Sequence, residues 1–335
     1  MNAMLEDLLD PASLPDPTRT VSVVHTHISM VLVADEYVYK IKKPVNFGFL
    51  DFSTLEKRAY YCRREVELNR RLSQDLYLGV VQVGMRAGRH VLGDFPADET
   101  VDYAVRMKRI PESLLMKRIF EEGLLSRADL DRVARVLARF HRTAAGGAEI
   151  EVFGKPEAFR VNTDENFEQV ERFVGKTIDE KAFVAIREWT NRFYEGNEAL
   201  FLQRIREGRI RDCHGDLHME HICLSDPVSV FDCIEFNDRF RYSDTLADIA
   251  FLMMDLEYRG GNDHAASLWE CYRDEAHEGE VENLLRFYKV YRAFVRGKVN
   301  SFQLDDRQIS APVKDEAART ASRYFRLALE YIEET

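Results

Sequence analysis

Three histidines and several carboxylates crowd into one short polar stretch near the middle of the 335-residue chain. The stretch runs from Arg211 to His221 and places Asp216 between His214 and His218. A carboxylate on such a loop can accept the proton of a hydroxyl that is held in line with a phosphoryl donor. A single aspartate in a turn is more often a cap or an Asx turn, so Asp216 needs a partner before it indicates chemistry.

A second carboxylate, Asp232, supplies that partner. Two short apolar stretches, 221–224 and 228–232, flank a turn signal at Ser225–Asp–Pro, which predicts a hairpin. The hairpin would fold back the 16 positions between Asp216 and Asp232, so that both side chains face one cavity. Hard oxygen ligands beside a bound triphosphate suit Mg²⁺, which prefers a few carboxylates together with phosphate oxygens and water.

The elements that must position these residues change character along the chain. The first hundred residues predict strands around one helix, which starts at the capping box Ser53–Thr–Leu–Glu56 and runs to about Leu72. Helical periodicity dominates after Pro111. The predicted strands are 21–25, 28–33, 37–41, 80–85 and 101–107, and the predicted later helices are 130–140, 157–174, 178–207, 243–258, 263–276, 280–302 and 312–333. We therefore predict an α+β fold with a β-rich N-terminal lobe, residues 1–108, and a mainly helical C-terminal lobe, residues 109–335.

The composition of the chain argues against several classes of protein. The net charge of −11 disfavours nucleic acid or an anionic membrane as the main partner. The five cysteines form no C-x-x-C pair, which argues against a disulfide framework and against a cysteine zinc site. No apolar run approaches the roughly 20 residues that cross a bilayer, and the acidic N-terminus lacks signal-peptide character. We expect a cytoplasmic protein, and the sequence leaves its oligomeric state open.

The motifs together resemble the aminoglycoside phosphotransferase family of the protein-kinase-like superfamily. The family signature H-G-D-L-H-x-x-N, an apolar-D pair and D-[LI]-A correspond here to His214–His218, Phe231–Asp232 and Asp248–Ile–Ala250. The resemblance is closer to an uncharacterised bacterial branch, which has the run found here from Tyr39 to Arg58 and the run C-I-E-F-N-D found at Cys233 to Asp238. It covers roughly residues 20 to 300.

The resemblance implies a bilobal kinase-like fold and an ATP-dependent transfer of the γ-phosphate to a hydroxyl of a small molecule, with Mg²⁺. Asp216 would be the base, flanked by His214 and His218, and Asp232 would be the main metal ligand. Lys40 would reach the α- and β-phosphates, with Lys42 as the alternative lysine.

Further roles follow from the same resemblance. Glu65 in the long helix would pair with the phosphate lysine, with Glu67 as the alternative. Asp248 would hold the catalytic loop through backbone hydrogen bonds, whereas a packed core histidine is the preferred role for His141. The segment Met107–Lys–Arg–Ile110 would link the lobes and bind adenine, so that Met107 and Arg109 belong to the nucleotide site.

Two departures from the family pattern affect the site. The second metal ligand of the family is an asparagine five positions after the catalytic aspartate, and here that position is His221. An imidazole nitrogen suits Mg²⁺ less well than an amide oxygen, so His221 either ligates weakly or contacts phosphate. The chain also has no G-x-G-x-x-G, so Ser29 or Thr26 and backbone N–H groups would contact the phosphates. Relatives in the branch often carry a second, P-loop domain, and no G-x-x-x-x-G-K-[ST] occurs in this chain.

Two other functions remain open from the sequence. One is a non-catalytic kinase-like module that binds nucleotide, which the substitution at His221 favours. The other is a metal-dependent hydrolase that uses the cluster His214, Asp216, His218 and His221. Such hydrolases need further histidine and asparagine motifs downstream, and the later His264 and His277 lack that context.

Overall fold

The computed structural model describes residues 2–306 and 309–333. Contacts between Cα atoms divide the chain into two compact units. The first, called here the sheet unit, comprises Met1–Glu122 and His221–Asp238, and the second, the helical unit, comprises Gly123–Glu220 and Arg239–Thr335. A β-rich part and a mainly helical part confirm the predicted α+β, kinase-like fold class.

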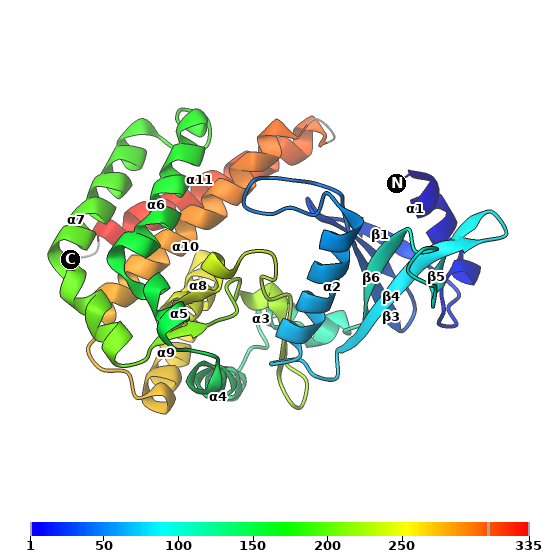
Figure 1. Ribbon diagram of the computed structural model, residues 1–335. Coiled ribbons are helices and arrows are strands. Elements are labelled where there is room, and N and C mark those ends of the chain that lie inside the picture. Colours follow the sequence, from blue (N-terminus) through cyan, green and yellow to red (C-terminus); the bar gives the residue numbers. More distant parts are fainter. Residues whose placement is uncertain (1, 307–308, 334–335) are drawn as a thin grey trace. The chain divides into compact units, whose positions relative to one another are not determined.

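An antiparallel sheet forms the centre of the sheet unit, with the strand order β1-β2-β3-β6-β4-β5 (Figure 1). Its strands are β1 (Ser22–His25), β2 (Ser29–Val33), β3 (Tyr37–Lys42), β4 (Tyr77–Arg86), β5 (Arg89–Gly93) and β6 (Asp102–Lys108). The long helix α2 (Leu55–Asn69) packs on β4 and β6. Its N-cap is Thr54, whose hydroxyl accepts the Lys57 N–H, so the cap lies one residue after the predicted Ser53.

In strand β3, side chains alternate between the two faces of the sheet, and this alternation places both lysines on one face. Tyr39 and Ile41 are buried in an apolar cluster with residues of β2 and of α1 (Asn2–Leu8). Side chains two positions apart point to the same face of a strand, so Lys40 and Lys42 both project from the opposite face. Both lysines make ion pairs with Glu65 of α2, which therefore lies over that face.

Strand β5 and helix α1 were not predicted. The β4–β5 hairpin turns at Ala87 and Gly88, which both have positive φ (49° and 80°), as a two-residue type I′ turn requires. Glycine adopts such a φ readily but alanine does not, and this weak turn signal explains why the strand was missed.

The predicted hairpin around the Ser225–Asp–Pro turn is present. Its strands are β8 (Ile222–Cys223) and β9 (Ser229–Val230), and they pair antiparallel. Hydrogen bonds attach the hairpin to the sheet unit: the Leu224 N–H donates to the Leu114 carbonyl at 2.8 Å, and the Ser73 hydroxyl donates to the Val230 carbonyl at 2.6 Å. The contact units therefore differ from the two lobes that we predicted on either side of residue 108, because 109–122 and 221–238 pack with the sheet.

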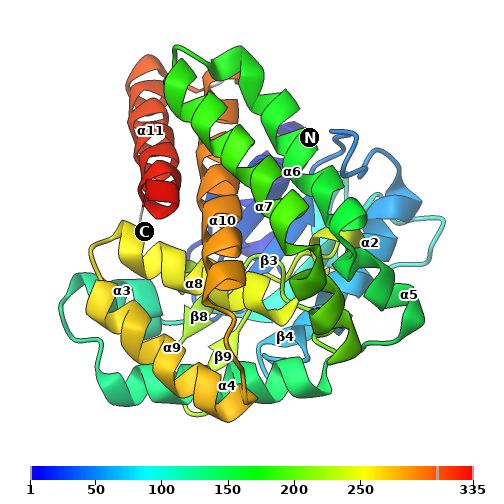
Figure 2. The same cartoon turned by 90° about the vertical axis from the view of Figure 1, so that its left-hand side faces the viewer.

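The helical unit is a bundle of helices in which α8 (Thr245–Tyr258) is nearly fully buried (Figure 2). Its other main helices are α4 (Arg127–Thr143), α6 (Pro156–Val170), α7 (Glu180–Arg206), α9 (Asn262–Ala276), α10 (Glu282–Phe302) and α11 (Ala311–Glu333). A short two-stranded ribbon, β7 (Ile210–Asp212) with β10 (Tyr242–Asp244), precedes α8. The predicted helices agree with these within a few residues; α4 and α11 have clear apolar stripes, whereas α8 is apolar nearly all round, as a buried helix is.

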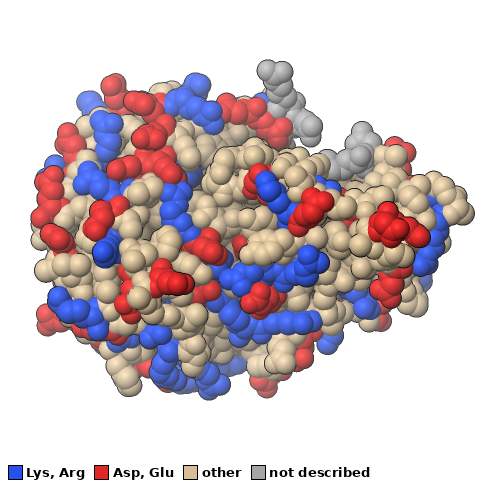
Figure 3. Space-filling view, viewed as in Figure 1, with Lys and Arg blue, Asp and Glu red and all other residues tan. Residues whose placement is uncertain are grey.

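Acidic and basic side chains are interspersed on the surface in view (Figure 3). Among the described residues, no helix combines the length and the apolar character that a membrane crossing would need.

Candidate active site

The loop that carries Asp216 lies in the helical unit and is held by a buried carboxylate. Asp248, in the first turn of α8, accepts hydrogen bonds from the backbone N–H of His214 at 2.7 Å and of Gly215 at 2.9 Å. Gly215 has a φ of 86°, a conformation that residues with a Cβ rarely adopt, and this explains the glycine of the H-G-D motif. The predicted supporting role of Asp248 is confirmed.

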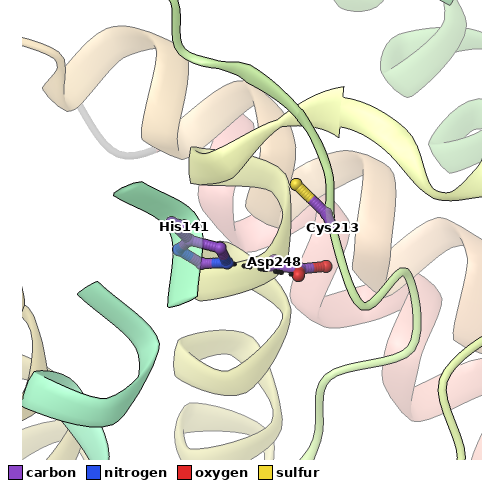
Figure 4. A group of neighbouring side chains, drawn as sticks. All are labelled: His141, Cys213 and Asp248. Atoms are coloured by element: carbon purple, nitrogen blue, oxygen red, sulfur yellow. Dashed lines mark hydrogen bonds and ion pairs between the residues drawn. The ribbon is translucent and has the colours of Figure 1, made fainter. Parts of the chain in front are cut away.

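Asp248 is itself part of a buried group with His141 and Cys213 (Figure 4). Their ligand atoms lie within 4.8 Å of one another, but each already has a hydrogen-bond partner. His141 Nε2 lies 3.3 Å from Asp248 and its Nδ1 lies 2.7 Å from the Tyr272 hydroxyl, while the Cys213 thiol donates to the Ser243 carbonyl at 3.4 Å. Burial also raises the pKa of the Cys213 thiol well above its usual value, so it stays protonated. The group supports the loop, and His141 is confirmed as a core histidine.

The lowered pKa of Asp248 allows its contribution to the stability of the loop to be measured as a function of pH. Burial opposes ionisation, but the hydrogen bond and charge of His141, with the charges of His214 and Arg292, lower the pKa of Asp248 to about 2. A carboxyl whose pKa falls on folding stabilises the protein above its unfolded pKa, near 4, and loses that contribution as the pH falls towards 2. Acidification from pH 5 to pH 2 should thus remove about 2–3 kcal/mol of unfolding free energy through this residue.

The measurement is urea unfolding at several pH values, with Asp248→Asn beside the wild type. The variant should be less stable at pH 7 and should lose about 2–3 kcal/mol less than the wild type on acidification, because its amide does not titrate. Parallel acid profiles for the two proteins would show that Asp248 does not carry this ionic support.

Two supports of the loop were missed by the sequence reasoning. Arg292 of α10 donates to the Gly215 carbonyl at 2.8 Å, and the Met219 N–H donates to Asp255 of α8 at 3.0 Å. Both partners lie far along the chain from the loop and belong to no local motif. An isolated arginine in a helix resembles any solvated arginine, so the sequence offered no signal for it.

Asp216 is more accessible to solvent than His214 and His218 of the same loop. Its side chain is 34% exposed and its carboxylate lies 3.6 Å from His218 Nε2. His214 and His218 are buried, and His214 Nδ1 accepts the Asp216 N–H at 3.3 Å. The two histidines therefore shape the loop around Asp216, whose carboxylate is the group that a ligand can reach.

In the sheet unit, Lys40 lies between two carboxylates. Its ammonium is 2.5 Å from Asp232 and 3.0 Å from Glu65. The structure thus brings together the strand lysine, the helix glutamate and the aspartate after the hairpin that the sequence pattern had singled out. Glu67, the alternative partner, is 68% exposed and pairs with Arg64, so that alternative is wrong.

Lys42 occupies a second, fully buried position beside the first. Its ammonium is 2.6 Å from Glu65 and also contacts Glu235. Glu235 follows the hairpin in the run C-I-E-F-N-D, and no role had been assigned to it. Two lysines and three carboxylates thus form one network, called here the lysine network: Lys40, Lys42, Glu65, Asp232 and Glu235.

Charge in the lysine network is unevenly distributed. Burial opposes ionisation of Glu65, but the charges of Lys40 and Lys42 lower its pKa below the usual value. Burial, together with the charge of Glu65, raises the pKa of Glu235 although Lys42 acts in the other direction. Burial also opposes the charge of Lys42, but the charges of Glu235 and Glu65 raise its pKa. Lys42 therefore remains charged, and of the two buried glutamates Glu65 keeps its charge more firmly than Glu235.

Asp232 has an unusual backbone that the structure holds in place. Its φ is 62°, in the left-handed region that costs a residue with a Cβ about 1–2 kcal/mol. The Asp232 N–H donates to the Tyr77 hydroxyl at 3.1 Å, and the next N–H, of Cys233, donates to Asn69 Oδ1 at 2.8 Å. Strain of this kind concentrates at functional sites.

His221 stands at the start of the hairpin beside Asp232. Its Nε2 lies 3.5 Å from Asp232 Oδ2. The position where the family pattern has an asparagine is therefore adjacent to the carboxylate, and an imidazole nitrogen points at it.

The remaining predicted nucleotide residues lie on the sheet. Ser29 is fully buried at the start of β2, and its hydroxyl has no hydrogen-bond partner among the described residues. The Thr26 hydroxyl accepts the Ser29 N–H at 2.9 Å and so closes the β1–β2 turn. Met107 lies in β6 opposite Val38. The Arg109 N–H donates to the Glu36 carbonyl at 2.8 Å and its guanidinium to the Ala34 carbonyl at 3.2 Å, which ties the end of β6 to the β2–β3 turn.

Comparisons with known proteins identify relatives of this chain. Uncharacterised proteins of Mycobacterium bovis and Mycobacterium tuberculosis are 33% identical over 314 residues, which cover 93% of this chain. The chain spans about 60% of the length of these relatives.

Solved structures share the fold at low identity. A Ralstonia eutropha protein, provisionally assigned as an aminoglycoside phosphotransferase, is 13% identical with a TM-score of 0.53, covering 96% of this chain and 95% of that one. Amicoumacin kinase hAmiN, in complex with AMP-PNP, Ca²⁺ and Ami, is 13% identical with a TM-score of 0.51, covering 95% and 90%. The model of the phosphotransferase enzyme family matches residues 38–294, which include Lys40, the Asp216 loop and α8. The chain belongs to the phosphotransferase enzyme family.

Proposed function

We propose that the protein transfers the γ-phosphate of ATP to a hydroxyl group of a small molecule. The observation that carries the proposal is the position of Lys40, whose ammonium contacts both Glu65 and Asp232. Phosphoryl transfer depends mainly on positioning and on charge stabilisation. Lys40 would bind the phosphates, and Asp216 would orient the acceptor hydroxyl and take its proton.

The residues around Asp232 fit a magnesium ion that accompanies the nucleotide. The Asp232 side chain is 40% exposed, and a hard carboxylate oxygen is the ligand type that Mg²⁺ prefers. The ion, when bound, would neutralise charge on the phosphate oxygens. His221, beside Asp232, would contact phosphate or ligate weakly through its softer nitrogen.

The lysine network explains how Lys40 can change partners. For the proposed reaction, Asp232 would exchange its contact with Lys40 for a metal ion, and Lys40 would be free to bind phosphate. Glu65 would not be left as an unpaired buried charge, because Lys42 contacts it at 2.6 Å. We propose that Lys42 is the structural lysine of the pair and Lys40 the phosphate lysine.

The test is ADP formation from ATP and Mg²⁺ by the full chain, across a panel of hydroxylated metabolites. A kinase would form ADP in proportion to a phosphorylated acceptor, identified by mass spectrometry. The rival function is a nucleotide-binding module without catalysis, which His221 favours. Tight ATP binding without transfer to any acceptor, unchanged by substitution of Asp216, would support the rival.

Replacing the two lysines separately should separate their roles. Lys40→Ala should weaken ATP binding by about 10- to 100-fold, the effect of one lost charge-assisted hydrogen bond, and should affect stability less. Lys42→Met should instead lower the unfolding free energy by about 3–5 kcal/mol, because it leaves the buried carboxyl group of Glu235 without the ammonium that contacts it. Titration calorimetry with ATP and urea unfolding measure the two effects.

The double variant Lys42→Met/Glu235→Gln is the matched control for stability. It removes the carboxylate that depends most on Lys42, so part of the lost stability should return. If Lys42→Met weakens ATP binding more than Lys40→Ala while both remain folded, the two assignments must be exchanged.

A further inference from the structure

Helix α6 of the helical unit presents a row of polar side chains that the proposed mechanism does not use. Asn162, Glu165, Asn166 and Gln169 follow the spacing i, i+3, i+4, i+7, which places them on one face of the helix. Asn162 and Asn166 are only 4% and 5% exposed. Buried amides are costly unless they are hydrogen-bonded, so their partners indicate what the face is for.

Lys298 of α10 lies against this face. Its ammonium donates to Asn166 Oδ1 at 2.6 Å and to Gln169 Oε1 at 3.0 Å. The ammonium also lies 5.7 Å from the centre of the Phe302 ring. An ammonium has three donors, and the two amides neutralise none of its charge.

Glu165, the carboxylate whose charge acts on Lys298, is already paired with Arg239. Glu165 accepts two hydrogen bonds from Arg239, at 2.9 and 2.6 Å. Among the described residues, no carboxylate lies within 4.0 Å of the Lys298 ammonium. Burial lowers the pKa of Lys298 to about 8, with Glu165 opposing and Arg239 reinforcing the shift. Lys298 is thus largely protonated at neutral pH, and its ammonium makes no direct ion pair with a carboxylate of the described residues.

A second observation on the same helix face also indicates a ligand. The Asn162 Oδ1 atom is buried and has no hydrogen-bond partner in the part of the chain that the structure describes. It lies one turn before Asn166 and would accept a hydrogen bond from a hydroxyl or another donor. Among the described residues, a cation in no direct ion pair and an acceptor without a donor together match a molecule that carries both an anionic group and hydroxyls.

Helix α10 connects this face to the Asp216 loop within the helical unit. Arg292 of α10 holds the Gly215 carbonyl, and the neighbouring Tyr291 lies within electrostatic range of Arg239 and Glu165. Lys298 is seven residues after Tyr291 and therefore lies on the same side of the helix. Six residues of helical rise separate it from Arg292, about 9 Å.

We propose that Asn162, Asn166, Gln169 and Lys298, called here the Lys298 site, bind a carboxylate-bearing part of the hydroxyl acceptor. This inference rests on the proposed function and specifies its substrate class as an acidic polyol. A polycationic acceptor of the aminoglycoside type would instead be repelled by Lys298.

The test uses matched ligands that differ only in charge. D-gluconate, D-sorbitol and D-glucamine share a six-carbon polyol chain with a negative, neutral and positive group at one end, and glycerate and glycerol form a shorter pair. Titration calorimetry of the full chain without nucleotide measures binding, and ADP formation measures transfer. Lys298→Gln and Lys298→Arg are compared with Lys181→Gln, which removes the same charge from an exposed position of α7.

The acids should bind at least tenfold more tightly than their neutral and cationic counterparts. Lys298→Gln should abolish that preference, Lys298→Arg should retain part of it, and Lys181→Gln should leave it unchanged. Binding of the acids should also weaken above pH 8 as Lys298 loses its proton.

The results distinguish a failure of the Lys298 site from a failure of the proposed kinase function. Lys298-dependent binding of the acids without phosphoryl transfer would support the site and refute the kinase function. Transfer to neutral or cationic acceptors that does not respond to Lys298→Gln would support the kinase and overturn the Lys298 site, as would equal binding of all three charge types or no binding of either acid.

Discussion

Asp216→Asn is expected to lower kcat for phosphoryl transfer by about 10²- to 10⁴-fold, the range contributed by a positioned general base. The amide keeps the size of the carboxylate but cannot accept the proton of the acceptor hydroxyl. The affinity for ATP should stay within about twofold, because Asp216 is not one of the residues of the lysine network. Steady-state kinetics with saturating acceptor, together with ATP titration, measure both quantities.

The matched control is Asp263→Asn, an exposed aspartate in the first turn of α9. It removes one negative charge from the same helical unit and should leave kcat unchanged. The Asp216 side chain is partly exposed, so its replacement should not unfold the protein, and far-ultraviolet circular dichroism checks this. A variant that keeps more than half of the wild-type kcat would exclude Asp216 as the base.

Asp232→Asn should have an effect as large on the metal-dependent reaction. A neutral amide holds Mg²⁺ more weakly than a carboxylate, and a bound metal supplies several kcal/mol of charge stabilisation in such transfers. We expect kcat, measured at about 1–5 mM Mg²⁺, to fall by about 10³-fold. A titration of activity against Mg²⁺ should also have its midpoint at a higher Mg²⁺ concentration than in the wild type.

The lysine network makes an additional prediction for this variant. Lys40 would lose its contact with Asp232 but keep Glu65, so binding of ATP without metal should be retained or improved. Asp226→Asn, at the exposed turn of the same hairpin, is the control and should behave as the wild type. Unchanged magnesium dependence in Asp232→Asn would transfer the metal role to another residue, with His221 the first to examine.

Much of the fold could be predicted because its signals are local. Helices of the helical unit such as α4 and α11 have apolar stripes of period 3.6, and β3 alternates apolar and polar residues, which by itself places Lys40 and Lys42 on one face. The hairpin around Ser225–Asp–Pro followed from turn chemistry in the same way. Strand β5 was missed because its turn contains alanine at a positive φ, which the sequence does not signal.

The same distinction between local signals and long-range packing applies to the residues of the site. The residues themselves singled out Asp216 and Asp232, and the family resemblance added Glu65 and Asp248 through the shared order of strand lysine, helix glutamate, loop aspartate and hairpin aspartate. Only the tertiary structure showed that both lysines contact Glu65, that Glu235 holds the buried Lys42, and that Arg292 holds the loop. Those contacts join residues up to 193 positions apart, and no local propensity encodes them. The sequence by itself determined which elements form and which motif residues they carry. The packing of distant elements decided which charges meet, because an ion pair depends on distance in space and not on separation along the chain.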